Sequence, residues 1–421
     1  MFAGLIARAA VHIFYQVDRA GSLPPGPVII LPNHPNALLD PALIWATAGR
    51  EVRFLAKSTL FRGPFGPFVR SAGAIPVFRK QDEGVDLSGN AEMFAAVDAA
   101  LERGEAICVF PEGISHSTGK LERLRTGAAR IALSATARGI PVQLVPVGIN
   151  PDRKTTFRSR MTVVYGRPFH VEAGTTVHAL TSDLTLRMRS LIIEADPEAD
   201  AALVIRIDQL YTAERDASVG AESAVERRRV IADALNRLRR DRADWYAASL
   251  LQLRKYDQRL RRFGLEDSAL DWSTSPAGAL RFCLREIPLA LILLPVAIAA
   301  LAVFAAPYAL TAASARLQKD SDVTATAKVL GGIVFYALWI FLLSITVALL
   351  FGAGAGWLTA AGLPLLAAAG LFSIERESSA LRTARSWLAL RGAHANTRTR
   401  LRRHRAELAE VLDEVNRHLN P

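Results

Sequence analysis

Cysteine is scarce in this sequence of 421 residues, which contains only Cys108 and Cys283. Neither residue has a second ligand nearby at metal-binding spacing, so the sequence predicts neither a disulfide framework nor a zinc site. Both are interpreted as small apolar side chains in a reducing compartment. We therefore expect no metal and no other cofactor.

Charged residues are missing from two long stretches, residues 287–314 and 329–374. Since about 20 apolar residues span a bilayer, the first stretch fits one crossing and the second fits two. The segment Gly352–Gly356 predicts a turn inside the second stretch. A helical pair in a large soluble core is the alternative, but core helices of this length rarely lack charge.

Acidic residues are fewer than basic residues, 40 against 51, which gives the chain a net charge of +11 that is carried mainly by arginine. Basic chains bind nucleic acid, anionic lipid or anionic small substrates. The basic residues are spread along several segments rather than interleaved with aromatic residues, which argues against nucleic acid as a partner. Membrane lipids and phosphorylated substrates are the predicted partners.

The patterning divides the chain into five parts. The apolar residues of segment 1–17 fall on one helical face, which predicts either an interfacial helix on a membrane or an ordinary docking helix. Alternating strand and helix patterns predict an α/β domain with a mixed sheet flanked by helices, followed by a helical region and two to three transmembrane helices. The expected parts are an interfacial helix at 1–20, the α/β domain at 21–177, a charged helical region at 178–275, a transmembrane region at 285–375 (spans at about 287–312, 329–351 and 355–374) and a basic helical tail at 376–421.

The number of crossings depends on which signal is followed. Length alone favours three crossings. Arginine-rich flanks lie before Ile287 and after Ile374, whereas residues 315–328 hold few basic residues. The positive-inside rule places both flanks in the cytoplasm, which requires two crossings and a third segment that is re-entrant or interfacial.

His34 and Asp40 are the first candidates for chemistry, because they follow the buried strand predicted at residues 28–31. Acyl transfer from a thioester to an alcohol needs a base near neutral pH, and histidine suits that role. A carboxylate on the other ring nitrogen fixes the tautomer and stabilises the imidazolium. Alone, the pair is also compatible with a structural histidine and a capping aspartate.

Three further motifs add weight to this pair, and each contains a predicted strand end. Gly73–Arg79 places Arg79 after an apolar strand, and arginine binds phosphate through paired donors. Phe110–His116 places Glu112 in a tight turn after another strand, and Leu144–Ile149 ends a third with proline and glycine. His116 is interpreted as a substrate contact or, more simply, as a hydrogen-bonded structural residue.

Taken in this order, the motifs resemble the four motifs of the glycerolipid acyltransferases that make lysophosphatidate and phosphatidate. The resemblance covers about residues 25–170. It implies that His34 is the general base and Asp40 its partner. It also implies a substrate-binding set, in which arginine and lysine hold the acceptor phosphate: Lys57, Arg79, Glu112, Gly113, Ser115 and Arg125.

The spacing of His34 and Asp40 departs from the commonest form of the family, since five residues rather than four lie between them. This longer spacing resembles the fungal-type glycerol-3-phosphate and dihydroxyacetone-phosphate acyltransferases. Gly113–His116, Leu124–Gly127 and the segment Phe157–Pro168 also resemble that branch. The loop between the two residues must absorb the additional residue.

The resemblance implies a membrane-bound enzyme of phospholipid synthesis. It would use acyl-CoA or acyl carrier protein as donor and glycerol-3-phosphate or a lysophospholipid as acceptor. We expect its catalytic domain to face the cytoplasm, in a bacterial inner membrane or an equivalent one. The alternatives are acylation of a non-phosphorylated, lipid-linked acceptor and a lipid-binding scaffold built on a degenerate acyltransferase fold.

Overall fold

The computed structural model describes residues 2–62, 66–78, 90–116, 118, 120–195, 200–215, 220–272, 275–318, 321–392 and 395–419. The chain divides into two compact units. We call them the sheet unit, which comprises residues 1–208, 218–236 and 319–329, and the helical unit, which comprises residues 209–217, 237–318 and 330–421.

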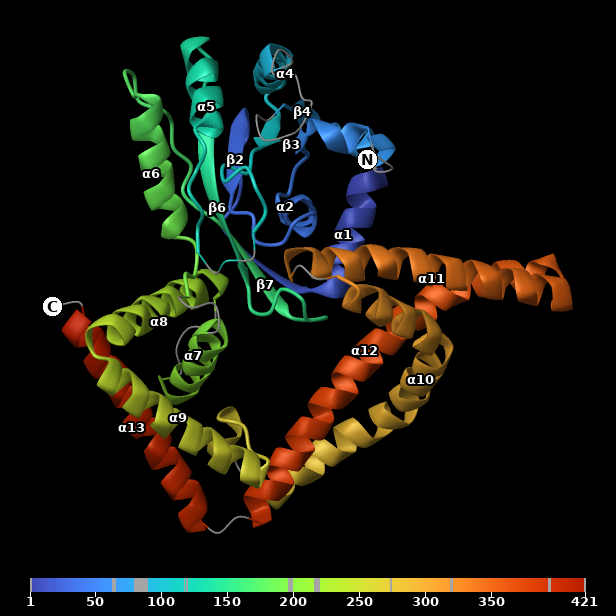
Figure 1. Ribbon diagram of the computed structural model, residues 1–421. Coiled ribbons are helices and arrows are strands. Elements are labelled where there is room, and N and C mark those ends of the chain that lie inside the picture. Colours follow the sequence, from blue (N-terminus) through green and yellow to red (C-terminus); the bar gives the residue numbers. More distant parts are fainter. Residues whose placement is uncertain are drawn as a thin grey trace. The chain divides into compact units, whose positions relative to one another are not determined.

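A seven-stranded sheet forms the centre of the sheet unit (Figure 1). Its strands run in the order β1-β7-β6-β2-β5-β3-β4, and all neighbours are parallel except β6 and β7. This mixed sheet confirms the predicted fold class. The strands are β1 (Gln16–Ala20), β2 (Val28–Pro32), β3 (Val52–Lys57), β4 (Ile75–Val77), β5 (Ala106–Cys108), β6 (Gln143–Pro151) and β7 (Arg160–Tyr165).

The central strand β2 is buried on both faces, as expected for a parallel sheet covered by helices. Because successive side chains point to opposite faces, Ile29 and Leu31 enter one core and Val28 and Ile30 the other. The first core is closed by α4 (Asn90–Glu102), α5 (Gly127–Ala137) and α6 (Val177–Arg189). The second is closed by α1 (Phe2–Phe14), α2 (Leu39–Thr47) and the start of α11 (Ser321–Phe351).

The N-terminal segment corrects the expected helix over residues 1–20. The helix α1 ends at Phe14, and the residues that follow form strand β1, which pairs in parallel with β7. The main-chain N–H of Arg158 donates to Phe14 O at 2.6 Å, and Gln16 N donates to Ser159 O at 3.1 Å. These bonds end the helix and begin a strand ladder, because the edge of β7 offers partners that the helical periodicity does not reveal.

The parallel arrangement brings the carboxyl ends of β2, β3, β4 and β5 to one edge of the sheet. His34 and Glu112 follow β2 and β5 at this edge, as the sequence predicts. Pro146 is an exception, because β6 continues past it to Pro151 and Pro146 pairs with Leu31 in mid-strand.

Two further helices of the charged region, α7 (Ala201–Arg215) and α8 (Ala221–Asp241), contribute residues to a buried ion-pair network in the sheet unit. The guanidinium of Arg228 contacts Asp208 at 2.7 Å and Asp152 at 2.6 Å, and Arg227 contacts Asp208 as well. Asp152 follows β6 directly. The network therefore links the first half of α8 to Asp208 of α7 and to the residue that follows strand β6.

Within the described part of the helical unit, three helices are long and apolar enough to cross a membrane. They are α10 (Pro276–Arg316), α11 from residue 330 onward, and α12 (Ala353–Gly392). Between α11 and α12 the backbone of Gly352 adopts a φ of 93°, so the predicted turn lies there. The unit also contains α9 (Ala243–Phe263), the short 3-10 helix η4 (Ser268–Asp271) and α13 (Ala395–Leu419).

Several arginines of the basic tail have structural partners within the helical unit. Arg398 and Arg402 donate to Leu270 O, and the buried Arg405 pairs with Glu214 at 2.6 Å and Asp271 at 2.7 Å. The charge of α13 therefore serves partly to attach this helix to η4 and α7.

Replacing Arg228 tests the buried network. Arg228→Met leaves Asp208 buried with one cation fewer and Asp152 without this partner, which we expect to destabilise the fold by about 3–5 kcal/mol. Thermal unfolding in detergent measures the effect. The matched control is Arg403→Met, which removes one member of an exposed pair with Glu407 and is expected to cost less than about 1 kcal/mol. Equal losses for both variants would contradict the importance of the network.

Candidate active site

His34 and Asp40 form a hydrogen-bonded pair at the carboxyl end of β2. Nδ1 of His34 lies 2.8 Å from Oδ2 of Asp40. The carboxylate is fully buried, whereas the imidazole remains 18% exposed and stacks on Phe110 with 4.1 Å between ring centroids. Burial raises the pKa of Asp40 above its usual value, and His34 offsets part of that rise. The arrangement leaves Nε2 as the ring nitrogen that does not face Asp40.

A tight turn absorbs the additional residue between His34 and Asp40. Ala37 has a φ of 46°, in the left-handed region that residues with a Cβ rarely adopt. Leu39 N donates to Asn36 O, and α2 begins at Leu39, so Asp40 lies in the first turn of that helix. Asp40 Oδ2 also accepts a hydrogen bond from Asn36 N at 2.7 Å. The longer spacing therefore preserves the pairing.

Glu112 is the most highly connected side chain of the site. Its carboxylate is buried, and Oε1 accepts from the main-chain N–H of His34 at 2.7 Å. Oε2 accepts from Glu122 N at 2.9 Å and contacts Nε2 of His116. Both oxygens are thus engaged by protein donors, and they join three separate segments around the histidine.

Ser115 and His116 continue this network. Ser115 Oγ accepts from Ala37 N at 3.0 Å, so it holds the turn that contains the left-handed residue. His116 N donates to His34 O at 3.2 Å, and its Nδ1 bonds to Thr118 Oγ1 at 2.8 Å. These hydrogen bonds are the ones that the structural interpretation of His116 predicts.

Three polar residues that support the pair were not singled out from the sequence. Asn36 Nδ2 donates to the buried hydroxyl of Tyr15 at 2.7 Å, and that hydroxyl in turn donates to Lys154 O. Asn33 bonds both main-chain polar groups of Ile149 in β6, at 3.1 and 2.7 Å. Burial raises the pKa of Tyr15 far above its usual value, so its hydroxyl stays protonated. In the sequence, the proximity of Asn33 and Asn36 to His34 was the one indication of a supporting role. Nothing in the sequence indicated such a role for Tyr15.

The remaining candidates lie at the same edge or outside the described residues. Gly113 has a φ of 73°, and a Cβ there would lie 3.2 Å from Cγ of Arg125, so the stem of Arg125 covers this turn. Lys57 is the last residue of β3. Arg79 lies outside the described residues. Arg158 and Arg160 have structural partners, since Arg158 donates to His12 O and Arg160 pairs with Asp18.

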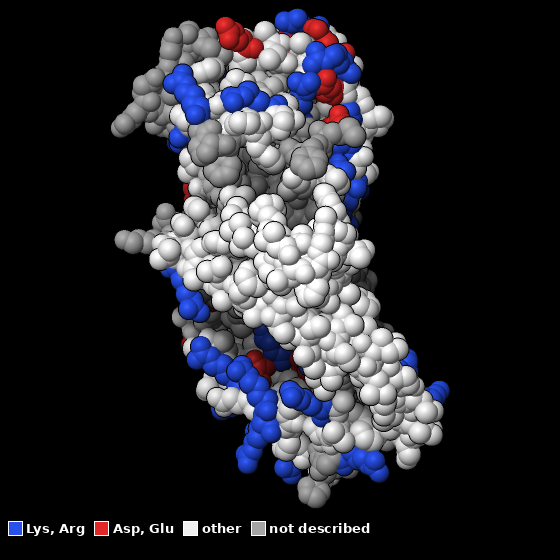
Figure 2. Space-filling view, turned by 90° about the vertical axis from the view of Figure 1, so that its right-hand side faces the viewer, with Lys and Arg blue, Asp and Glu red and all other residues white. Residues whose placement is uncertain are grey.

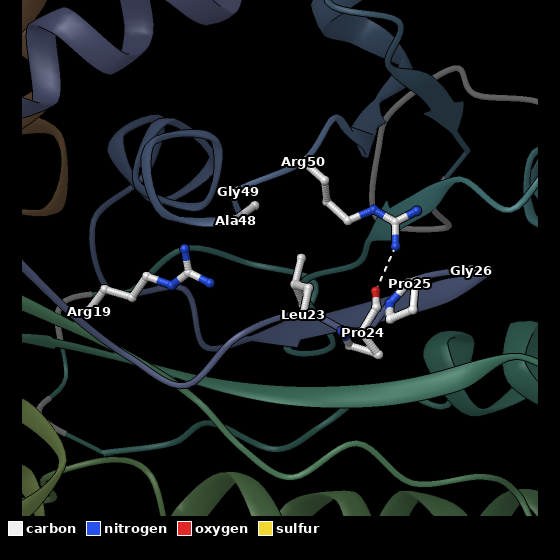
Figure 3. Close-up of a pocket in the computed structure, with 8 residues that line it drawn as sticks. All are labelled: Arg19, Leu23, Pro24, Pro25, Gly26, Ala48, Gly49 and Arg50. Carbon is white, nitrogen blue, oxygen red and sulfur yellow. Dashed lines mark hydrogen bonds between the residues drawn. The ribbon is translucent and has the colours of Figure 1, made fainter.

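A cavity of about 620 Å³ lies at the amino ends of strands β2 and β3, opposite the edge that carries His34. It is lined by Arg19 of β1 and by residues that precede β2 and β3. Arg50 donates to Pro24 O at 2.7 Å (Figure 3). It also donates to Gly104 O at 2.6 Å, and Arg19 donates to Gly21 O. These bonds hold both arginines to the main chain. The cavity contains neither His34 nor Glu112 and is separate from the candidate site.

The family model named Acyltransferase matches residues 15–150, which contain His34, Asp40 and Glu112. Glycerol-3-phosphate O-acyltransferase 2 of Saccharomyces cerevisiae is 31% identical over 129 residues, which are 28% of this chain and 17% of the yeast protein. The crystal structure of the 1-acyl-sn-glycerophosphate (LPA) acyltransferase PlsC from Thermotoga maritima aligns with 45% of this chain and 77% of that chain, at 19% identity and a TM-score of 0.36.

The Glu112–His116 pair makes the stability of the sheet unit depend on pH. Burial lowers the pKa of His116, but the hydrogen bond and charge of Glu112, with Glu122 and Asp40, outweigh burial and raise it. The stabilisation is therefore complete below the unfolded pKa of about 6.5 and is lost as pH rises through the raised folded value. The melting temperature should exceed that of His116→Gln by more at pH 6 than at pH 9. A gap that does not change with pH would refute a protonated His116.

Proposed function

We propose that the protein is a membrane-bound O-acyltransferase of phospholipid synthesis. It moves a fatty acyl group from acyl-CoA or acyl carrier protein to glycerol-3-phosphate or lysophosphatidate. The observation that carries this proposal is the pair of His34 and the buried Asp40, with Nε2 of the imidazole left for a substrate hydroxyl. A degenerate scaffold would have no need to keep a buried carboxylate on the ring.

The reaction needs one base and no protein nucleophile. Nε2 of His34 takes the proton of the acceptor hydroxyl while its oxygen attacks the thioester carbonyl carbon. The new O–C bond forms and the C–S bond breaks, and the thiolate leaves with the proton that His34 returns. Asp40 fixes the tautomer with Nδ1 protonated and stabilises the imidazolium that forms.

The other residues of the site divide into two groups. We assign Glu112 and Ser115 to positioning, because their oxygens accept bonds from the loop that carries His34. Lys57 and Arg125 are assigned to the acceptor phosphate, since cations at this edge of the sheet complement its charge, and Arg79 is assigned to it from the sequence motif alone. Gly113 provides the turn that lets the stem of Arg125 cover this loop.

The dyad is tested with His34→Ala and a matched control. Because a positioned base contributes about 10²–10⁴-fold, kcat should fall by at least that factor while the melting temperature stays close to that of the parent protein. His178→Ala is the control, since His178 is exposed on α6, and it should retain full activity. Turnover by folded His34→Ala protein at the parental rate would remove this mechanism.

The acceptor is tested with purified membranes supplied with labelled acyl-CoA and either glycerol-3-phosphate or lysophosphatidate. The name of the yeast relative and the spacing of His34 and Asp40 both favour glycerol-3-phosphate. We expect a higher kcat/KM for it, and a lower one after Arg79→Ala through a raised KM. Efficient acylation of a phosphate-free acceptor by Arg79→Ala protein would instead favour a lipid-linked, non-phosphorylated substrate.

A further inference from the structure

The helices α11 and α12 pack back against each other at the Gly352 turn. A Cβ placed on Gly356 would lie 2.5 Å from Cβ of Ala348 and 2.9 Å from the carbonyl oxygen of Ser344. Small residues allow two helix backbones to approach this closely in membranes. The two helices therefore form a hairpin whose tip is Gly352.

The first charged residues on the two arms of this hairpin lie at nearly equal depth. Lys328 precedes the tip by 24 residues (352 − 328), and Glu375, next to Arg376, follows it by 23 (375 − 352). At about 1.5 Å per residue, each arm is about 35 Å long, which is enough for the hydrocarbon core of about 30 Å. Both arms thus leave the bilayer on one face, which we call the base of the hairpin.

Both ends of the charge-free part of α10 lie beside this base. At its beginning, Glu286 forms an ion pair of 2.8 Å with Arg376. At its end, a Cβ on Gly331 would lie 3.1 Å from Oγ of Ser314, so the backbones of α10 and α11 are close together there. Gly331 is only three residues beyond Lys328. A helix that crossed the bilayer would have its two ends on opposite faces.

The middle of α10 is also attached to the hairpin. Pro307 has no N–H, so the carbonyl of Val303 lacks its usual helical partner. The indole Nε1 of Trp339 donates to this carbonyl at 2.9 Å. Next to it, Phe304 stacks on Tyr336 with 5.6 Å between ring centroids. These contacts hold the middle of α10 against the middle of α11, 8 to 11 residues beyond Lys328.

The outer face of α10 is apolar along its length. Its exposed side chains recur at helical spacing and leave Ala297 and Ala300 on the packed face. Figure 2 shows a continuous surface without charged residues on the side where these helices lie. The acyl-chain region of a bilayer is the occupant that fits such a stripe next to a membrane hairpin. The stripe consists of Leu280, Leu284, Ile287, Leu291, Leu294, Ile298 and Leu301.

We infer that α11 and α12 cross the bilayer twice as a hairpin, whereas α10 is re-entrant: both of its ends lie at the base of the hairpin, its middle near Pro307 reaches the middle of α11, and it does not cross. Residues 319–329 belong to the sheet unit and lead directly into the membrane part of α11, so the sheet unit lies on the same side of the bilayer as the base. The tail after α12 lies there too. Arginines flank the base and none lies at the tip, which places the base in the cytoplasm.

Cysteine labelling of the full chain in intact cells tests this topology independently of any acyl transfer. The background is Cys283→Ser, because Cys283 is exposed and the remaining Cys108 is buried. Four exposed positions then report the side reached by a membrane-impermeant maleimide. The variants are Glu172→Cys in the sheet unit, Gln318→Cys after α10, Gly354→Cys at the tip and Glu410→Cys in the tail.

The hairpin predicts that only Gly354→Cys is labelled from outside, and that the other three are labelled after permeabilisation. Three crossings predict a different pattern. Gln318→Cys and Glu410→Cys would then be labelled from outside, and Gly354→Cys would be protected. Protection of all four in intact cells would also overturn the inference, because nothing would then cross. Labelling after denaturation confirms that each introduced thiol is present when it exceeds that of the Cys283→Ser background, in which Cys108 alone reacts. A Cβ at Gly354 meets no atom within 4 Å.

Discussion

The buried carboxylate of Glu112 joins segments that would otherwise be independent loops. A carboxylate removed from water costs several kcal/mol unless donors surround it. Here the donors are the main-chain N–H groups of His34 and Glu122 and the ring of His116. Each donor is held in position because the buried negative charge of Glu112 is stable only when it is hydrogen-bonded. The position of the His34 imidazole is therefore set by hydrogen bonds to its main chain from the protein interior rather than by any contact with substrate.

A second constraint acts from the other side of the same loop. Asp40 must reach Nδ1 of His34 across five intervening residues, and Ala37 adopts a left-handed conformation to let it do so. Such a conformation costs roughly 1–3 kcal/mol in a residue with a Cβ. The bonds from Ala37 N to Ser115 and from Asn36 to Tyr15 and Asp40 hold the turn against that cost. The pairing of His34 with Asp40 thus depends on both the strained backbone of Ala37 and the burial of the Asp40 carboxylate.

Much of this arrangement could be predicted because it depends on local patterns. The strand before His34 is a run of apolar residues, and parallel strands bring their carboxyl ends together, so His34 and Glu112 could be placed at one edge. The role of Glu112 could not, because its partners come from residues 34, 116 and 122. Strand β1 was missed because the apolar spacing of residues 1–17 is helical, and its pairing partner lies far along the chain in β7.

Hydropathy also does not reveal that α11 is shared between the two units. Its first residues belong to the sheet unit, and the apolar run after Lys328 belongs almost entirely to the helical unit. Helix α11 is continuous from Ser321 to Phe351, yet Ala325 and Val329 are buried in the core of the sheet unit with Val11 and Phe14. This piece of the core is made after α10, late in synthesis. Because domains fold largely in the order in which they leave the ribosome, the sheet must wait with one face incomplete. Maturation of the domain is thereby coupled to delivery of the chain to its membrane.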